Sequence, residues 1–581
     1  MPSKNKQFRE TITLGTSLLF CSAWIIYMML KSPVPNDVGD GIMHYFISNA
    51  SWENPELFLH HWGKPFFILL SSSFAQFGFY GMVVFNLLAF CFTVIIGFKL
   101  LRKYSVPIYL QILLPLVLLK AHDIANTILG GMTEPLFNLS LMAALFFLSE
   151  KKYFWFALVL STMPFLRSEG QLPLLIGLMV LLFAKQFKYI PLLASTFLIY
   201  GIVGFFVYRD FFWYFTQSPY QMSNNIYGSG TWDHYLLSYK NYIGNPGLYL
   251  FILAIPSFFY MLWKKVIIDW RLWIFSYGVF FGILIAHSYF WATGQNGSLG
   301  LTRIATQGVP VFIIMNLIAI HNVPWSKNVV AKWLSYCFAL GIAYALVTTK
   351  YYPKKIELLE AEIMKTADYL KNQNLRNRKV YYHAPLLAYE YGENPLKQNK
   401  KLIYYTFSNL DNDLRTILKP GDLIVRDSHF GPLEMLLPLS KIKDHPDLQI
   451  VKEYLCSEQI PDALNEKEGV IILEYKPNIK TFQGSDSVIT IKADQEYSGL
   501  NAFFPKSNKA LKLKLSIKTN NDGFALVYDH NNGASYTFTD LKASEQFNGS
   551  FVLHGDGKTK IYIWNPRKLN GKIKLEKIII E

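Results

Sequence analysis

The chain has 581 residues, of which 51% are hydrophobic and only 17% are charged. Soluble proteins carry roughly 25% charged residues, so this composition excludes an ordinary soluble protein and indicates one that crosses a membrane several times. The formal net charge of +15 does not indicate nucleic-acid binding, because the basic residues are scattered or flank apolar segments without forming a compact stripe. Three of the four cysteines fall in apolar segments, which leaves neither a disulfide framework nor a cysteine metal site.

The first ~350 residues predict about eleven transmembrane helices, at ~20 apolar residues per span. The first, residues 12–30, follows three basic residues and is not followed by a signal-peptide cleavage site, so we expect a helix that stays in the membrane. The others are expected near 66–100, 106–120, 133–149, 153–166, 171–184, 188–208, 246–263, 270–290, 305–321 and 329–349. Because 66–100 is longer than one span, part of 66–78 is expected in the interface or in a separate short helix.

Basic residues between the spans predict the orientation. They fall in every second connection, so all of them lie on one side of the membrane: Lys4, Lys6, Arg9, Arg102, Lys103, Lys151, Lys152, Lys185, Lys188, Lys264, Lys265 and Lys327. If these residues face the cytoplasm, the chain is a multi-pass protein of the plasma (inner) membrane. The outer face then receives the loops 31–65, 121–132, 167–170, 209–245 and 291–304, together with everything after Lys350.

The first outer loop carries more chemically active groups than a simple connection needs. It contains Asp37, Asp40, His44, Glu53, Glu56, His60, His61 and Lys64. The segment Gly41–Ala50, which follows Asp40, is expected to form a short interfacial helix. The histidines and aspartates could hold a divalent metal, although the adjacent pair His60-His61 also fits a residue pair at the membrane interface.

Four more charged residues are predicted on the same face. Glu134 starts a span, where a helix start capped by Thr133 is an equally good interpretation. Arg167 and Glu169 lie between two apolar runs and could form a plain interfacial ion pair. Arg303 precedes a late span and could be an ordinary snorkelling anchor. Each signal is weak alone, but charged groups at membrane depth tend to be functional, and these gather on one face.

The charged tail after residue 350 predicts two further domains. Residues 351–477 alternate helix and strand and are expected to form a small extracytoplasmic α/β domain, in which Asp427 and His429 follow a strand and are more often structural than functional. Residues 478–581 show short period-two strands separated by Gly, Asn and Asp turns, which is typical of a β-sandwich. The chain contains neither a P-loop nor a dinucleotide-binding glycine motif.

Residues 10–350 resemble the multi-spanning glycosyltransferases of the GT-C fold, which use polyprenyl-phosphate-linked sugars and include the dolichyl- or undecaprenyl-phosphate mannosyltransferase-like and aminoarabinose transferase-like enzymes. The resemblance rests on the acidic first outer loop with His44-Tyr45, on Trp62-Gly-Lys-Pro65, on Thr133-Glu-Pro-Leu-Phe, on Arg167-Ser-Glu-Gly170 and on Arg303. It differs from the family in one respect, since Asp37 and Asp40 are spaced where the family has an adjacent acidic pair.

The resemblance implies a membrane domain of GT-C type over residues 1–350 and an inverting transfer of a sugar from a polyprenyl-phosphate donor. The acceptor would be a hydroxyl of a lipid, a glycan or a protein at the outer face. Asp40 is the expected general base, with Asp37 as the second candidate. Lys64, Arg167 and Arg303 are the expected phosphate or sugar ligands, and Glu134, Glu169 and His44 are expected to contact or orient them. The alternatives are a polymerase or ligase acting on a lipid-linked oligosaccharide, and a non-enzymatic transporter or lipid-carrier translocase with glycan-binding outer domains.

Overall fold

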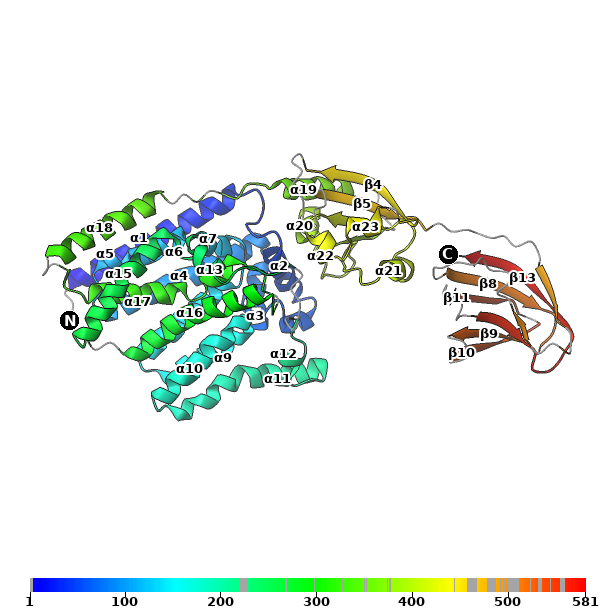
Figure 1. The fold of residues 1–581 in the computed structure, drawn as a ribbon, viewed down its shortest axis with the longest axis horizontal. Helices are drawn as coiled ribbons and strands as arrows, with labels where there is room; N and C mark the ends of the chain where they lie inside the picture. The colour runs from blue at the N-terminus through cyan, green and yellow to red at the C-terminus, as the bar shows by residue number, and fades with distance from the viewer. Residues whose placement is uncertain are drawn as a thin grey trace. The chain divides into compact units, whose positions relative to one another are not determined.

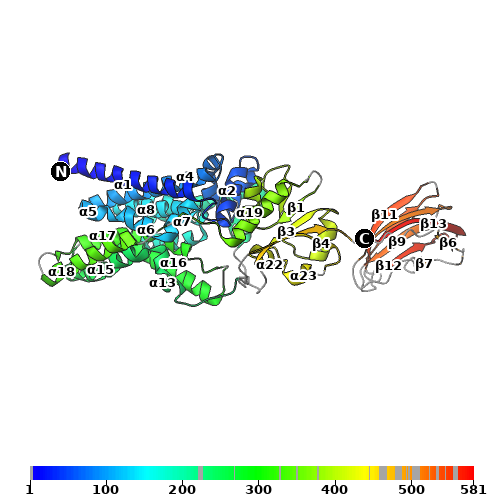
Figure 2. The same cartoon turned by 90° about the horizontal axis from the view of Figure 1, so that it is seen from above.

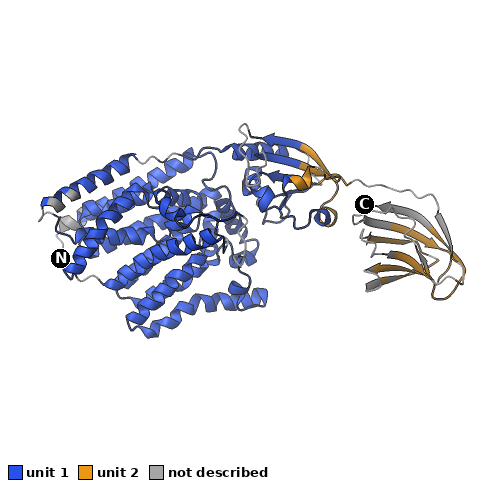
Figure 3. Cartoon of the chain, in the orientation of Figure 1, with its two compact units in different colours: residues 1–413, 423–439, 452–472 blue, residues 414–422, 440–451, 473–581 orange. Residues whose placement is uncertain are grey.

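A computed structural model describes residues 4–580 except 220–226, 267–268, 297, 326–328, 349–350, 352, 374, 376–377, 444, 457–467, 478–486, 492–493, 495–496, 500–510, 523, 531–534, 544 and 554–559. Lys327, Lys350 and the predicted domain boundary at residue 478 therefore lie outside the described residues. The chain divides into two compact units, residues 1–413, 423–439 and 452–472 in the first and residues 414–422, 440–451 and 473–581 in the second (Figure 3).

The first unit begins with a large bundle of apolar helices (Figure 1). Among the described residues, five helices are long and apolar enough to cross a membrane. They are the helices over Glu10–Lys31 (in α1, Lys4–Lys31), Phe79–Lys103 (α4), Phe187–Tyr208 (η4, Phe187–Ala194, with α11, Ser195–Tyr208), Gly244–Trp263 (α15) and Trp270–Thr293 (α16). A bent pair, Ile108–Lys120 and His122–Leu129, would make a sixth.

Shorter apolar helices complete the bundle. They are α3 (Pro65–Ala75), α8 (Glu134–Ser149), α9 with η2 (Tyr153–Phe165), η3 with α10 (Ser168–Phe183), α17 (Val309–His321) and the end of α18 (Val329–Thr348). The predicted long span at 66–100 is two helices, α3 and α4, which Gly78 at φ 80° separates. The number of membrane crossings, expected as about eleven, stays a prediction.

Several short elements connect or interrupt the long helices of the bundle. The first connection forms α2 (Asp40–Ala50) and η1 (Pro55–Leu59), which confirms a short helix directly after the Asp37-to-Asp40 turn. The segment expected as an outer loop at 121–132 contains a buried helix, α7 (His122–Leu129). Other short pieces are α5 (Ile108–Gln111), α6 (Leu113–Lys120), α12 (Trp213–Thr216), α13 (His234–Leu237), α14 (Tyr239–Tyr242) and η5 (Thr302–Thr306).

An α/β region follows the bundle. Its helices are α19 (Leu358–Lys371), α20 (Pro385–Tyr391), α21 (Leu410–Thr416), α22 (Phe430–Leu433) and α23 (Leu439–Ile442). Its strands are β1 (Val380–Tyr382), β2 (Leu402–Tyr404), β3 (Leu423–Asp427), β4 (Leu448–Leu455) and β5 (Gly469–Tyr475), in the sheet order β2-β1-β3-β5-β4. The strands β2, β1 and β3 run parallel, so their carboxyl ends share one edge of the sheet.

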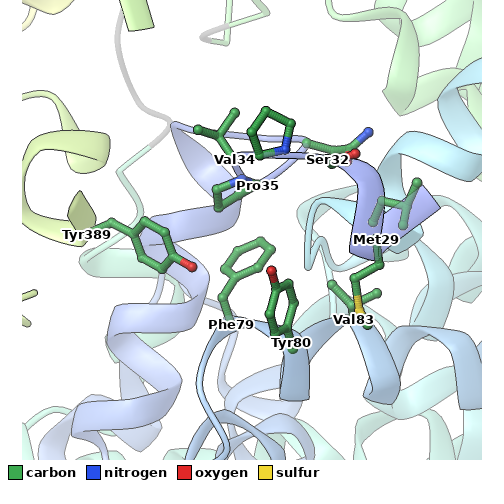
Figure 4. Close-up of a pocket in the computed structure, with 11 residues that line it drawn as sticks. Met29, Ser32, Val34, Pro35, Phe79, Tyr80, Val83 and Tyr389 are labelled. Atoms are coloured by element: carbon green, nitrogen blue, oxygen red, sulfur yellow. The ribbon is translucent and has the colours of Figure 1, made fainter. Parts of the chain in front are cut away.

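The α/β region contacts the bundle through α20, which packs against α2 (Figure 1). Figure 2 shows strands β1, β3 and β4 of this region from above. The ring of Tyr389 on α20 lies edge-on to Tyr45 and Phe79, with ring centroids 6.3 Å and 6.0 Å away. Figure 4 shows Tyr389 beside Phe79 and Tyr80 around a small cavity of about 30 Å³. This volume holds only one or two water molecules, so the cavity is a packing gap at the contact and is too small for a substrate.

The second unit contains two antiparallel four-stranded sheets with the orders β10-β9-β12-β7 and β11-β8-β13-β6. Their strands are β6 (Ser487–Ile491), β7 (Tyr497–Gly499), β8 (Leu511–Thr519), β9 (Phe524–His530), β10 (Ser535–Leu541), β11 (Phe547–Leu553), β12 (Lys560–Trp564) and β13 (Gly571–Ile580). A separate apolar core forms from alternating residues of both sheets, including Leu515, Leu526 and Ile561. The sheets agree with the predicted sandwich, whereas the bounds of the three predicted domains stay predictions.

Candidate active site

The start of α2 places two carboxylates next to each other but gives them different surroundings. Asp37 Oδ1 accepts hydrogen bonds from the backbone N–H groups of Gly39, at 3.2 Å, and Gly41, at 2.9 Å. Asp37 thereby satisfies donors at the helix start that would otherwise lack a partner. Asp40 is the first residue of α2, and its side chain is 41% exposed compared with 20% for Asp37. Asp37 is therefore mainly held by the protein, and Asp40 is the more accessible of the two.

Arg303, in η5, binds both carboxylates with its two terminal nitrogens. Its Nη1 donates to Asp37 Oδ2 at 2.5 Å, its Nη2 donates to Asp40 Oδ2, and its Nε lies 3.8 Å from Glu134 Oε1. Burial lowers the pKa of Arg303, but the carboxylates of Asp37 and Asp40 outweigh it and raise that pKa above its usual range. The guanidinium group is thus a fixed positive charge. The snorkelling interpretation of Arg303 is wrong, because its charged end points into the protein.

Arg167 forms a second ionic group that shares a carboxylate with Arg303. Its Nη1 lies 2.8 Å from Glu134 Oε1, and its Nη2 lies 3.1 Å from Glu169 Oε1. Nη1 also donates to Thr133 Oγ1 at 2.7 Å, and Thr133 makes no capping hydrogen bond to α8. Glu134 is completely buried between the two guanidinium groups. It therefore links Arg167 and Arg303, two cations that the sequence predicted on one face.

Glu169 is the carboxylate on the other side of Arg167. Burial raises its pKa, but Arg167 and His287 outweigh burial and hold the pKa of Glu169 well below its usual range. His287 Nε2, on α16, lies 3.6 Å from Glu169 Oε1, and Gln307 Nε2 donates to the same oxygen at 3.4 Å. His287 and Gln307 were not predicted from the sequence. An ionisable side chain inside an apolar span is the signal that could have found His287.

Lys64 stands directly before α3 and is buried. Its backbone has φ 68° and ψ 102°, an uncommon conformation for a residue other than glycine, and Pro65 follows as the first helical residue. Lys64 Nζ donates to Ser168 Oγ at 2.9 Å. Burial lowers the pKa of Lys64 to about 7, while Glu169 raises it and Arg167 lowers it further. The ammonium group is therefore poised to gain or lose its charge near neutral pH.

His44 lies one helical turn after Asp40, and its ring stacks on Trp62 at 4.7 Å between centroids. Burial, followed by the charges of Arg167 and Arg303, lowers the pKa of His44 to about 3, so the ring is neutral. His60 Nδ1 accepts from the backbone N–H of Gly63 at 3.0 Å. His61 Nε2 lies 2.8 Å from the backbone oxygen of Tyr214. Among the described residues, no group of three His, Cys, Asp or Glu side chains is arranged to hold a metal ion.

These groups surround one large cavity of about 1020 Å³. One wall is polar and contains Asp40, His44, Lys64, Arg167, Glu169 and Arg303. A second wall is apolar and contains Leu172 and Leu175 from α10 and Ile283 and Phe290 from α16. The α/β region forms the third wall with Leu396, Tyr404, Phe430 and Glu434. In the described part of the chain, Asp37 and Glu134 do not line the cavity and stand behind its polar wall.

The fold and this site define a membrane protein with a polar cavity at one end of its helical bundle. No protein-family model matches the chain, and no curated protein sequence is significantly similar to it. Two solved structures of ArnT from Cupriavidus metallidurans, one bound to undecaprenyl phosphate and one in the apo state, are similar to it. Both have a TM-score of 0.50, with 11% and 10% sequence identity, over 78% and 79% of this chain and 97% and 98% of theirs.

At this low identity the likeness to ArnT shows the fold alone. The resemblance to a GT-C fold that the sequence indicated is confirmed at this level, since ArnT is an aminoarabinose transferase of that fold. The likeness covers most of the chain, so it is a property of the whole architecture and does not depend on a single motif.

Proposed function

We propose that this chain is a membrane glycosyltransferase that moves a sugar from a polyprenyl-phosphate donor to an acceptor hydroxyl at the outer face of the plasma membrane. One observation carries the proposal. In a fold shared with ArnT, a single cavity brings Asp40, Lys64, Arg167 and Arg303 together beside an apolar wall. A lipid-linked sugar phosphate needs cations for its phosphate, an apolar surface for its lipid and a base near the anomeric carbon.

The apolar wall supports a lipid-linked donor. Leu172, Leu175 and Ile283 lie on helices of the membrane bundle and face the same cavity as the cations. A polyprenyl chain could follow these side chains while its phosphate lies at the polar wall. A water-soluble sugar nucleotide would gain nothing from this surface, which favours the lipid donor.

In the proposed reaction, the acceptor oxygen forms a bond to the anomeric carbon while the bond from that carbon to the phosphate oxygen breaks. The phosphate leaves with the electron pair, and the acceptor proton moves to Asp40. Arg303, Arg167 and Lys64 stabilise the phosphate charge, a contribution of the kind that preorganised cations make in phosphate chemistry. Glu134 and Glu169 orient the two guanidinium groups, and His44 contacts the sugar as a neutral ring.

The pairing of Asp40 with Arg303 has a consequence for the order of events. The Asp40 oxygen that binds Arg303 is occupied by a guanidinium N–H group and cannot take the acceptor proton at the same time. A donor phosphate that enters the polar wall competes for Arg303 and loosens its hold on Asp40. Asp37 keeps its two backbone N–H donors throughout. We therefore propose that donor binding activates Asp40 and leaves Asp37 as the structural anchor.

The experiment incubates the purified full-length protein with a panel of radiolabelled polyprenyl-phosphate sugars, with cell-envelope membranes as the acceptor source. The proposal expects release of polyprenyl phosphate and transfer of label to acceptor from at least one donor. A transporter or translocase would move a lipid-linked donor across a vesicle membrane without cleaving it. Transport without cleavage of any donor would therefore contradict the proposal.

A further inference from the structure

The third wall of the cavity contains a hydrogen-bonded cluster around Glu434. Glu434 Oε2 lies 3.2 Å from His383 Nε2, and Glu434 Oε1 accepts a hydrogen bond from Tyr227 Oη at 2.5 Å. His383 Nε2 also lies 2.6 Å from Tyr404 Oη. His383 is buried, while Tyr404 and Glu434 are half-buried and reach the cavity. The cluster thus presents one carboxylate and one phenol to the cavity, and His383 holds both in place.

The cluster lies where open α/β sheets bind their ligands. His383 directly follows β1, Tyr404 ends β2, and the segment with Glu434 follows β3. These three strands are parallel neighbours, so all these side chains meet at the carboxyl edge of the sheet. Ligands of such sheets bind outside this edge. The α/β region therefore presents its usual binding edge to the cavity that contains Asp40.

Phe430 joins the binding edge to the loop with the proposed base. Asp427 Oδ1 accepts from the backbone N–H groups of His429, at 2.9 Å, and Phe430, at 2.7 Å, which fixes the turn before α22. The ring of Phe430 reaches the turn before α2, since a Cβ on Gly39 would lie 3.5 Å from Phe430 Cζ. Gly39 directly precedes Asp40. A group bound against Phe430 is therefore next to the proposed base.

The charges of this corner of the cavity favour one kind of ligand. Burial raises the pKa of Glu434, but hydrogen bonds from His383 and Tyr227 outweigh it and hold the pKa below its usual value. Asp40 and Glu434 both contribute, after burial, to the raised pKa of Tyr404, so both carboxylates act on the same space. Once the donor phosphate holds Arg303, these two carboxylates accept hydrogen bonds from hydroxyl groups and repel a second phosphate or a carboxylate group.

We propose that Phe430, Tyr404 and Glu434 bind the acceptor and that this acceptor is a neutral saccharide. The inference rests on the proposed function, because it assigns the acceptor half of the same site. The two rings provide the flat apolar surface on which a sugar ring packs. Glu434 accepts hydrogen bonds from sugar hydroxyls, and the hydroxyl to be modified then lies beside Asp40. An acceptor with a phosphate near that hydroxyl is rejected.

The binding experiment uses the full-length protein in lipid nanodiscs with saturating undecaprenyl phosphate, so that the cations of the polar wall are occupied. Saturation-transfer NMR measures binding of methyl glycosides of mannose, glucose, galactose and N-acetylglucosamine, and of their 6-phosphates. We expect at least one neutral glycoside to bind at least tenfold more tightly than its 6-phosphate. Equal or tighter binding of the phosphates, or no binding of any neutral glycoside, would overturn the inference.

Variants of the third wall test the assignment to these residues. Phe430→Ala should weaken binding of the neutral glycoside at least fivefold, and Glu434→Gln should reduce the discrimination against the 6-phosphate to less than threefold. The matched control is Glu453→Gln, a change of an exposed carboxylate on β4, which should alter neither value. If Glu434→Gln and Phe430→Ala bind like the wild type, the acceptor site is elsewhere.

Kinetics separate this inference from the proposed function. With donor and acceptor varied independently, Glu434→Gln should raise the KM for the acceptor more than tenfold and the KM for the donor less than threefold. A larger effect on the donor KM would assign Glu434 to the donor and overturn the inference. Absence of any donor cleavage by the wild type would contradict the proposed function, while the NMR result would still decide whether a neutral saccharide binds.

A second arm distinguishes a lipid-linked glycan from a soluble one. It compares each methyl glycoside with the dodecyl glycoside of the same sugar, after correction for partition into the nanodisc. Tighter binding of the dodecyl form supports a saccharide on a membrane lipid, and equal binding supports a soluble or protein-linked glycan. Both results require the same sugar contacts with Phe430 and Glu434.

Discussion

Asp37 and Asp40 bind the same guanidinium group, yet only Asp40 lines the cavity. The other carboxylate oxygen of Asp37 accepts hydrogen bonds from the backbone N–H groups of Gly39 and Gly41. The side chain of Asp40 is twice as exposed as that of Asp37. The spacing of three residues, which left the base ambiguous in the sequence, thus gives the two carboxylates different tasks.

The first prediction concerns the guanidinium group that joins these carboxylates. Arg303→Lys should lower kcat/KM for the donor at least ~100-fold. The ammonium group of lysine lacks the planar guanidinium geometry that lets Arg303 bind both aspartates and a phosphate. Arg271→Lys is the matched control, since Arg271 pairs with Asp269 and Tyr153 and does not line the described cavity. Turnover of Arg303→Lys within threefold of the wild type would show that the guanidinium group is not needed.

The second prediction is that donor binding depends on pH through Lys64. Burial lowers the pKa of Lys64 to about 7. Below pH 7 the ammonium is charged and attracts the donor phosphodiester, which carries its single negative charge throughout this range. Above pH 7 binding must take up a proton, so the affinity for the donor should fall by up to about tenfold per pH unit. Donor binding measured between pH 6 and 9 checks this, and Lys64→Arg should flatten the profile. A flat wild-type profile would contradict it.

The third prediction tests how closely α2 approaches α7. A Cβ on Gly41 would lie 2.0 Å from the backbone oxygen of Gly130 and 3.0 Å from Asp37 Cβ. Gly41→Ala must therefore push α2 and its aspartates away, and overpacking of this kind costs about 1–3 kcal/mol. We expect a lower Tm in detergent and a loss of at least tenfold in kcat/KM. Gly15→Ala, where no heavy atom lies within 4 Å of the new Cβ, should leave both unchanged.

Much of the site could be predicted from the sequence, because its charged residues stand out against apolar spans. Charge alternation was enough to gather Asp40, Lys64, Arg167 and Arg303 on one face, and the structure brings them to one cavity. The pairing of Arg303 with Asp37 could not be predicted. It joins residues 266 positions apart, and only the tertiary fold, in which η5 packs against α7, decides which cation meets which carboxylate.

The third wall of the cavity could not be predicted for a different reason. Tyr404 and Glu434 are ordinary residues of a soluble α/β sequence, and their importance comes from the sheet edge they share and from the docking of α20 on α2. Asp427, which the sequence singled out at a strand end, proves to fix a turn. It positions Phe430, so the structural interpretation of Asp427 was the better one.

Turnover of Asp40→Asn and Asp37→Asn, measured with the same polyprenyl-phosphate donor and acceptor, tests the central claim most directly. A positioned base contributes roughly 10²–10⁴-fold, so Asp40→Asn should lower kcat by at least ~100-fold while expression and membrane insertion stay normal. Asp37→Asn should chiefly lower Tm, because it weakens the start of α2. Near-wild-type turnover of Asp40→Asn would move the base to Asp37, and full activity of both variants would contradict the mechanism.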